Sequence, residues 1–163
     1  MRSLLLGTRD GIAGAVYGTI VVLAALIAGA SAYKHDLWRL EGVVASSVLV
    51  LWVAHMYAHG VGQSLELGRR LTGAERRAVA RRELSIVLAA VLPLSVVTLG
   101  ALGVLGSSTA LWVAFGIGIA TLTVQGVRYA QLERFGLLGT LLAVGINVAL
   151  ALVLVAVKVL LSH

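Results

Sequence analysis

Five long runs of apolar residues, separated by short polar segments, are the feature that most constrains this chain. A helix that crosses a bilayer needs about 20 predominantly apolar residues, and each run is close to that length or longer. Only 12% of the residues are charged, against about 25% in a typical soluble domain. The pattern predicts an all-α integral membrane protein forming a single membrane domain over residues 1–163, with spans at about 11–33, 42–62, 84–105, 110–130 and 135–161.

The basic residues between the runs predict an orientation. If the N-terminus is cytoplasmic, ten of the 13 Lys and Arg residues lie on the cytoplasmic side: Arg2, Arg9, Arg69, Arg70, Arg76, Arg77, Arg81, Arg82, Arg128 and Arg134. Lys34, Arg39 and Lys158 then lie outside. Cytoplasmic loops of membrane proteins carry such an excess of positive charge. The Ala-, Gly-, Val-, Leu- and Arg-rich composition is typical of a GC-rich bacterial genome, so we expect the bacterial inner (plasma) membrane.

The polar segment 63–83, between the second and third spans, holds six of these arginines: Arg69, Arg70, Arg76, Arg77, Arg81 and Arg82. No aromatic residues alternate with them, so the segment lacks the pattern of a nucleic-acid-binding patch. We expect these arginines to face anionic lipid headgroups instead. Thr72-Gly73-Ala74-Glu75 has the spacing of a capping box. It predicts a short cytoplasmic helix that begins after Thr72 and leads into span three.

Two histidines lie in span two. Ionisable residues inside a span are energetically costly and therefore suggest function. His55 and His59 share a helix face because they are four residues apart, and Gln63 and Glu66 continue the same stripe. Two imidazoles one turn apart can bind a transition metal such as Zn, Fe or Ni, or relay protons. Alternatively, each ring hydrogen-bonds a neighbouring helix near the cytoplasmic interface.

Two other polar residues lie at the start of span one and in the middle of span five. Asp10 either interacts favourably with the helix dipole or faces a pore, and Asn147 should hydrogen-bond across a helix interface. The hypothesis of a transport pathway therefore names Asp10, His55, His59, Gln63, Glu66 and Asn147, with His55 and His59 as metal ligands.

Small residues and one proline indicate how the spans pack. Gly14 and Gly18 form a GxxxG spacing, which lets another helix approach closely. Pro93, the only proline, lies near the middle of span three, where it removes one backbone hydrogen bond and should kink the helix. We assign Gly14, Gly18 and Pro93 to helix packing.

The sequence does not predict an enzyme. His55 to His59 forms an HxxxH motif, but membrane di-iron oxygenases need a larger set than the four histidines present. HExxH, GxSxG and paired intramembrane aspartates are absent from the sequence. The absence of cysteine excludes disulfides and thiol nucleophiles. We expect no tightly bound cofactor, and a transition-metal ion only as a substrate.

Short motifs at corresponding places in the spans suggest a family. Asp10-Gly11-Ile12 opens span one, Ala54, Ala58, His59 and Gly60 lie late in span two, Leu92-Pro93-Leu94 lies in span three, and Phe135-Gly136-Leu137-Leu138-Gly139 opens span five. In these motifs and in layout the chain resembles the vacuolar iron transporter family. The resemblance implies five spans, a cytoplasmic N-terminus, and a homodimer whose central pathway is lined by spans one and two.

The chain departs from that family between spans two and three. Family members often carry Glu- and Met-rich helices there that collect metal, whereas this segment has only Glu66, Glu75 and Glu83 among six arginines. The chain therefore resembles a short member that lacks the cytoplasmic metal-binding domain, and His59 stands where the family usually has an acid.

Two functions follow from these patterns. The first is a homodimeric membrane transporter or channel for divalent metal ions, coupled to protons. The alternative is a non-transporting membrane module that assembles with itself, with lipid, or with another, unidentified membrane protein. A water-accessible cavity on which the polar side chains converge would favour transport, whereas closed apolar interfaces would favour the module.

Overall fold

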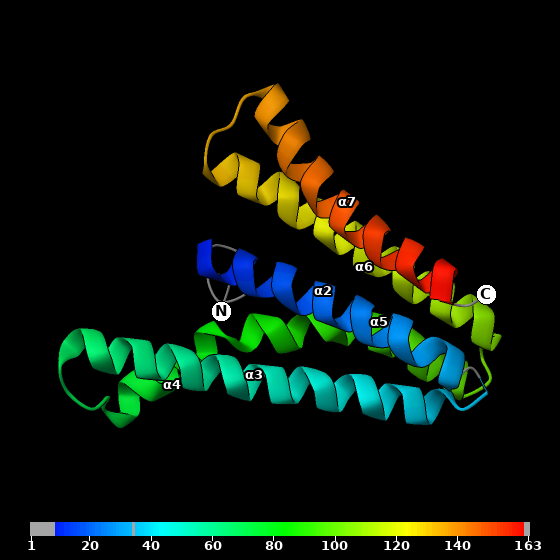
Figure 1. The fold of residues 1–163 in the computed structure, drawn as a ribbon, viewed down its shortest axis with the longest axis horizontal. Helices are drawn as coiled ribbons and strands as arrows, with labels where there is room; N and C mark the ends of the chain where they lie inside the picture. Colours follow the sequence, from blue (N-terminus) through cyan, green and yellow to red (C-terminus); the bar gives the residue numbers. More distant parts are fainter. Residues whose placement is uncertain (1–8, 34, 162–163) are drawn as a thin grey trace.

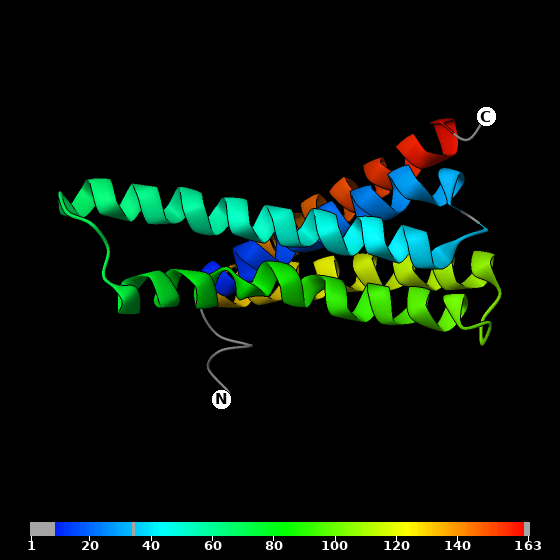
Figure 2. The same cartoon turned by 90° about the horizontal axis from the view of Figure 1, so that it is seen from below.

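A computed structural model describes residues 9–33 and 35–161 as a bundle of helices, with no strand in these ranges. The helices are α2 (Arg9–Ala32), α3 (Leu37–Leu67), α4 (Gly73–Arg82), α5 (Leu84–Ala101), α6 (Ser107–Leu132) and α7 (Leu137–Leu161). The long helices alternate in direction along the chain (Figures 1 and 2). The segments 68–72 and 133–136 therefore lie at the end of the bundle where α2 begins, which we call the arginine-rich end. The all-helical prediction is confirmed.

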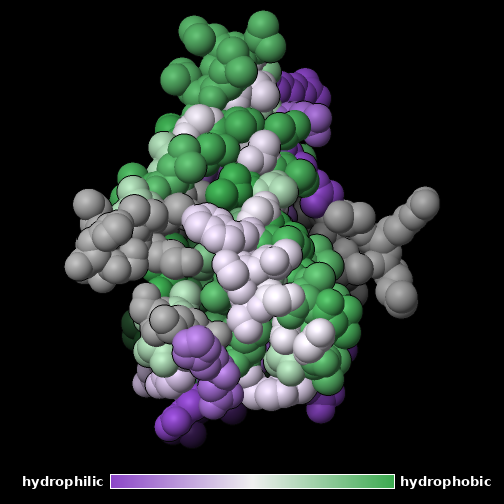
Figure 3. Space-filling model, turned by 90° about the vertical axis from the view of Figure 1, so that its right-hand side faces the viewer, coloured by the Kyte–Doolittle hydropathy of each residue, from purple (hydrophilic) through white to green (hydrophobic). Residues whose placement is uncertain are grey.

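Four helical segments are long and apolar enough to cross a membrane: Gly11–Ala30, Leu37–Leu67, Gly73–Ala101 and Ser107–Leu132. Helix α7 contributes a shorter apolar stretch, Leu137–Leu150. Figure 3 looks onto the end of the bundle opposite α4, where hydrophobic side chains occupy the upper part and one flank of the view, with paler and hydrophilic residues between and below them. Large hydrophobic side chains are also exposed along the helices, among them Val50, Leu92, Trp112 and Ile146. Soluble monomers rarely expose contiguous apolar surface on this scale, so these helices are compatible with a membrane protein.

Several helix boundaries differ from the sequence prediction. Helix α3 continues to Leu67, into the polar segment predicted from residue 63. The polar loop expected at 34–41 is shorter, because α3 already begins at Leu37. Asp36 caps this helix by accepting a 3.0 Å hydrogen bond from the backbone N–H of Arg39, and Leu37 and Leu40 are buried in the core. The predicted end of span three also differs. Helix α5 ends at Ala101 rather than near residue 105, and the following turn includes Gly103 with φ of 78°.

Helix α2 lies at the centre of the bundle, packed against α3, α5 and α6. Leu23 and Leu26 are fully buried in the apolar core. Gly14 and Gly18 face α5, and a Cβ atom on Gly18 would lie 2.6 Å from the backbone oxygen of Ile86. The absence of side chains at this point allows the two backbones to approach closely. Pro93 is buried within α5, which continues through it as a helix.

The predicted capping box is present. The Thr72 hydroxyl accepts a hydrogen bond from the backbone N–H of Glu75, and the Glu75 carboxylate accepts a 2.7 Å bond from the Thr72 N–H. Helix α4 then returns along the end of α3, where the Trp52 Nε1–H donates a 3.3 Å bond to the Ala80 carbonyl. The regular helix is interrupted at Glu83, and α5 follows at once.

Candidate functional site at the arginine-rich end

A histidine and a buried carboxylate meet where α3 passes the junction of α4 and α5. Nδ1 of His59 lies 2.7 Å from Oε1 of Glu83. The Glu83 side chain is only 7% exposed, whereas the His59 side chain is 50% exposed. This contact is an ion pair when the imidazole is protonated, and a hydrogen bond donated by Nδ1–H when it is neutral.

A pocket of about 280 Å³ surrounds this pair. His55 and His59 of α3 line it together with Tyr17 of α2, Arg82 of α4 and Glu83. The Tyr17 and His55 rings are 4.8 Å apart between centroids, and the His55 and His59 rings are 5.9 Å apart. The wall on the α2 side includes Ala13 and Gly14. Three helices thus bring two imidazoles, a phenol, a guanidinium and a carboxylate to one pocket.

The turn between α3 and α4 explains why these groups meet. Gly68 ends α3 in the left-handed region, with φ of 61°, where glycine carries no steric penalty. Thr72 then starts α4 in the reverse direction. His59 and Glu83 lie nearly the same number of residues before and after this turn, so the helical hairpin places them at the same level.

The turn also holds an exposed ion pair. Arg69 donates bonds of 3.0 Å and 2.8 Å to the two carboxylate oxygens of Glu75. This hydrogen-bonded pairing, followed by the bonds from Thr72, lowers the pKa of Glu75 to about 2. The same hydrogen bond raises the pKa of Arg69. Arg69 is therefore engaged within the protein rather than directed at lipid alone.

A second polar pocket, of about 410 Å³, lies on the other side of α2. Gln125 and Tyr129 of α6 line it with Glu133, which follows α6, and Asn147 of α7. The Oε1 atom of Gln125 is buried there without a hydrogen-bond partner among the described residues. Ala13 and Tyr17 of α2 belong to the walls of both pockets. The start of α2 therefore separates two polar pockets at the same end of the bundle.

The predicted pathway residues are only partly brought together. His55 and His59 share the first pocket, and Asn147 lies in the second. Gln63 and Glu66 lie further along α3, outside the lining of both pockets. Asp10 belongs to the first turn of α2, but its side chain falls outside the described side chains. The four polar residues of α3 thus share a helix face, but only His55 and His59 line the same pocket.

Sequence reasoning did not assign Glu83 or Tyr17 to the site. In the sequence Glu83 is only one of three acids in a basic segment. Its position opposite His59 could have been found by folding the sequence back at the predicted capping box. Tyr17 is one residue before Gly18 in the GxxxG stretch, and no sequence pattern indicated that its ring would contact His55.

The site residues include metal-ligand types, but in the described part of the chain no three His, Cys, Asp or Glu side chains come close enough together to hold a metal ion. His55, His59 and Glu83 line one pocket, and within it His59 is bonded to Glu83.

A further carboxylate lies at the opposite end of the bundle, between α3 and α5. The Thr98 hydroxyl lies 2.7 Å from Oε1 of Glu41, and Oε2 of Glu41 is buried without a partner among the described residues. Between Glu41 and Glu83 the interface is filled by buried apolar side chains that include Val44, Val48 and Ile86. The two carboxylates are thus separated by closed apolar packing.

No family model matches the chain, and neither a curated protein nor a solved structure matches it.

Proposed function

We propose that the chain is a membrane transporter for a cation, in which the His59–Glu83 pair takes up and releases a proton. The observation that carries this proposal is the 2.7 Å contact between a half-exposed imidazole and a buried carboxylate inside a pocket. Histidine is the side chain whose ordinary pKa is closest to neutral pH. An ionisable pair within or beside a membrane span is a typical element of a proton relay.

The position of the His59–Glu83 pocket supports access for ions from the arginine-rich end of the bundle alone. The pocket is lined by the first turns of α2 and by the end of α3, and the apolar core of Leu23, Leu26 and Ile86 lies beyond it. In an alternating-access mechanism a site is open to one side while apolar packing closes the other. Transport then requires α2 to move relative to α3 and α5, and the small residues Gly14 and Gly18 face α5 along this boundary.

The cargo in this proposal is the proton itself or a divalent metal ion exchanged for protons. A metal would use His55, His59 and Glu83 as ligands after His59 releases Glu83, because imidazoles and carboxylates are ligands of Zn²⁺ and Fe²⁺. The resemblance to vacuolar iron transporters supports metal as cargo, homodimeric assembly and a cytoplasmic location of the arginine-rich end. Five spans, with α7 as the fifth, belong to the same proposal.

The alternative function is a non-transporting membrane module. The observation that favours it is the closed apolar packing between Glu83 and Glu41. In that case the His59–Glu83 contact would only fasten α3 to the α4–α5 junction.

Flux through the purified protein in liposomes distinguishes the two functions. We would measure proton movement with an internal pH-sensitive dye, with and without Fe²⁺, Mn²⁺, Zn²⁺, Co²⁺ or Ni²⁺ outside. The proposal expects flux in the native protein that is lost in Glu83→Gln, which keeps the size of the side chain and removes its charge. Glu66→Gln is the matched control, since Glu66 is exposed and lies outside both pockets.

A second pair of variants tests the histidines. His59→Ala should abolish flux, whereas His35→Ala should leave it unchanged because His35 is exposed near the opposite end. Flux that survives in both Glu83→Gln and His59→Ala would exclude the role assigned to the pair. Absence of flux for every ion, from protein shown to be folded by circular dichroism, would leave the non-transporting module.

A further inference from the structure

A third and larger cavity, a groove beside the end of α3, is separate from both pockets described above. It encloses about 480 Å³ between α3, the 68–72 turn and α4. Its walls are largely apolar and include Val53, Met56 and Tyr57 of α3 and Val79 of α4. Gly60 widens it, because a Cβ atom there would have only Leu71 Cδ1 nearby, at 3.8 Å.

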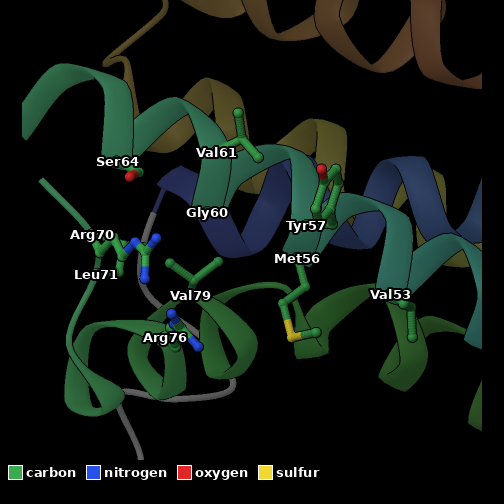
Figure 4. Close-up of a pocket in the computed structure, with 10 residues that line it drawn as sticks. All are labelled: Val53, Met56, Tyr57, Gly60, Val61, Ser64, Arg70, Leu71, Arg76 and Val79. Atoms are coloured by element: carbon green, nitrogen blue, oxygen red, sulfur yellow. The ribbon is translucent and has the colours of Figure 1, made fainter. Parts of the chain in front are cut away.

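Two arginines stand at one end of this groove. Figure 4 shows the side chain of Arg70 beside Val79 and that of Arg76 beneath Val79, both below α3. Both arginines are exposed, and no acidic side chain is among the residues that line the groove. The neighbouring Glu75 is bonded to Arg69 instead. The groove therefore has largely apolar walls and two positive charges at one end.

The depth of the groove in a membrane follows from the helix lengths. Leu37 at the start of α3 lies against Gly100 at the end of α5, so α3 begins at the level where α5 ends. Counted from Leu37 at about 1.5 Å per residue, Val53 lies about 24 Å and Ser64 about 40 Å along α3. A hydrocarbon layer of about 30 Å would then end between these two residues.

The groove thus crosses the boundary between hydrocarbon and headgroups. Its apolar part lies at the depth of acyl chains, and Arg70 and Arg76 lie at the depth of phosphate groups. Guanidinium groups bind phosphate through paired hydrogen bonds. A zwitterionic lipid carries its own positive charge close to the phosphate, which the two arginines would repel, whereas an anionic lipid does not.

We propose that this groove is a binding site for one anionic phospholipid, with an acyl chain along Val53, Met56 and Tyr57 and the phosphate held by Arg70 and Arg76. The site is independent of the transport proposal, because none of these residues lines the His59–Glu83 pocket. A bound lipid in this groove also differs from the diffuse attraction of a basic segment to a membrane, because only two of the six arginines would contact its phosphate.

Native mass spectrometry of the detergent-purified protein tests the site. The probes are palmitoyl-oleoyl phosphatidylglycerol, phosphatidylcholine with the same acyl chains, and glycerol 3-phosphate as the free headgroup. We expect phosphatidylglycerol to bind at least about tenfold more tightly than the other two. The Arg70→Gln/Arg76→Gln variant should weaken this binding by about 30-fold, because two charge-assisted guanidinium–phosphate contacts are lost.

Two variants make the test specific. Arg77→Gln/Arg81→Gln removes the same charge from exposed arginines outside the groove, and should change the affinity by less than about threefold, since only dispersed attraction is lost. Gly60→Phe should fill the groove and weaken lipid binding while leaving the arginines in place. Equal losses in the two double-arginine variants, no effect of Gly60→Phe, or glycerol 3-phosphate binding as tightly as lipid would each overturn the proposal.

Discussion

His59 and Glu83, 24 positions apart in the chain, are joined by a 2.7 Å contact between Nδ1 and Oε1 that fastens α3 to the junction of α4 and α5. The two side chains differ strongly in exposure, with the carboxylate buried and the imidazole half exposed. The imidazole is thus the more accessible member of the pair. Loss of either side chain would therefore be felt differently, because only Glu83 would be left as a buried group without its partner.

Replacing His59 by Ala should destabilise the fold by about 1–3 kcal/mol, because it leaves the buried Glu83 carboxylate without its partner. Replacing Glu83 by Gln should have a smaller effect, since the amide still offers an acceptor to Nδ1–H. Unfolding in mixed micelles of increasing SDS content measures both changes.

A double-mutant cycle separates the contact from other effects of the substitutions. The coupling free energy between His59→Ala and Glu83→Ala should be at least about 0.5 kcal/mol, as for residues in direct contact. The cycle of His55→Ala with Glu83→Ala serves as the control, since His55 contacts Tyr17, and should give a smaller value. Equal coupling in both cycles would contradict a specific His59–Glu83 contact.

The helices and the capping box could be predicted because both depend on local sequence. Apolar runs of sufficient length determine the spans, and Thr72 with Glu75 determines the start of α4. Asp36 is of a residue type that caps helices, but the polar residues between Lys34 and Glu41 outnumber the apolar ones, a composition that predicts a loop. The segment is helical instead from Leu37 on, because one helix face buries Leu37 and Leu40 while Trp38 and Arg39 stay exposed.

The site was harder to predict because it depends on pairs of residues far apart in the chain. The periodicity of α3 identifies the face that carries His55 and His59, but not which helices cover it. Glu83 enters the site through the hairpin between α3 and α4, and Tyr17 through the packing of α2 on α5. The same periodicity grouped Glu66 with the histidines, although α3 extends beyond the other helices there and leaves Glu66 exposed.

Gly18 and Gly14 should respond differently to alanine, although both belong to the GxxxG stretch. On Gly18 a Cβ atom would lie 2.6 Å from the backbone oxygen of Ile86, so the helices must separate. On Gly14 it would meet the Ser85 hydroxyl, which can rotate away. Gly18→Ala should destabilise the fold by about 1–3 kcal/mol through overpacking, and Gly14→Ala by less, measured by the same SDS titration.

Gly116 supplies the control for the glycine series. It lies in α6, and a Cβ atom there would meet nothing within 4 Å. Gly116→Ala should be neutral or stabilise the protein by up to about 1 kcal/mol through helix propensity. Equal effects at Gly18 and Gly116 would mean that α2 and α5 do not pack closely at Gly18.

The Glu75 carboxylate should titrate near pH 2. Its folded pKa of about 2 lies below the ordinary value of about 4.3, so the pairing stabilises the turn fully above about pH 4.3 and loses this effect as the pH falls through about 2. Carboxyl ¹³C shifts of glutamate-labelled protein, assigned with Glu75→Gln, measure this titration. Arg69→Gln should move the pKa back towards its ordinary value, because the hydrogen bond from Arg69 is the main cause of the shift. An unchanged pKa in Arg69→Gln would contradict that assignment.

The orientation of the bundle can be tested with single cysteines, because the native chain contains none. Ala78 is exposed on α4, at the arginine-rich end, and Ser108 is exposed at the start of α6, at the opposite end. If basic loops stay in the cytoplasm, a membrane-impermeant maleimide should label Ser108→Cys in intact cells and Ala78→Cys only after permeabilisation. Gly136→Cys should behave like Ala78→Cys, because 68–72 and 133–136 lie at the same end of the bundle. Labelling of Ala78→Cys in intact cells would reverse the orientation and place the His59–Glu83 pocket on the outer face.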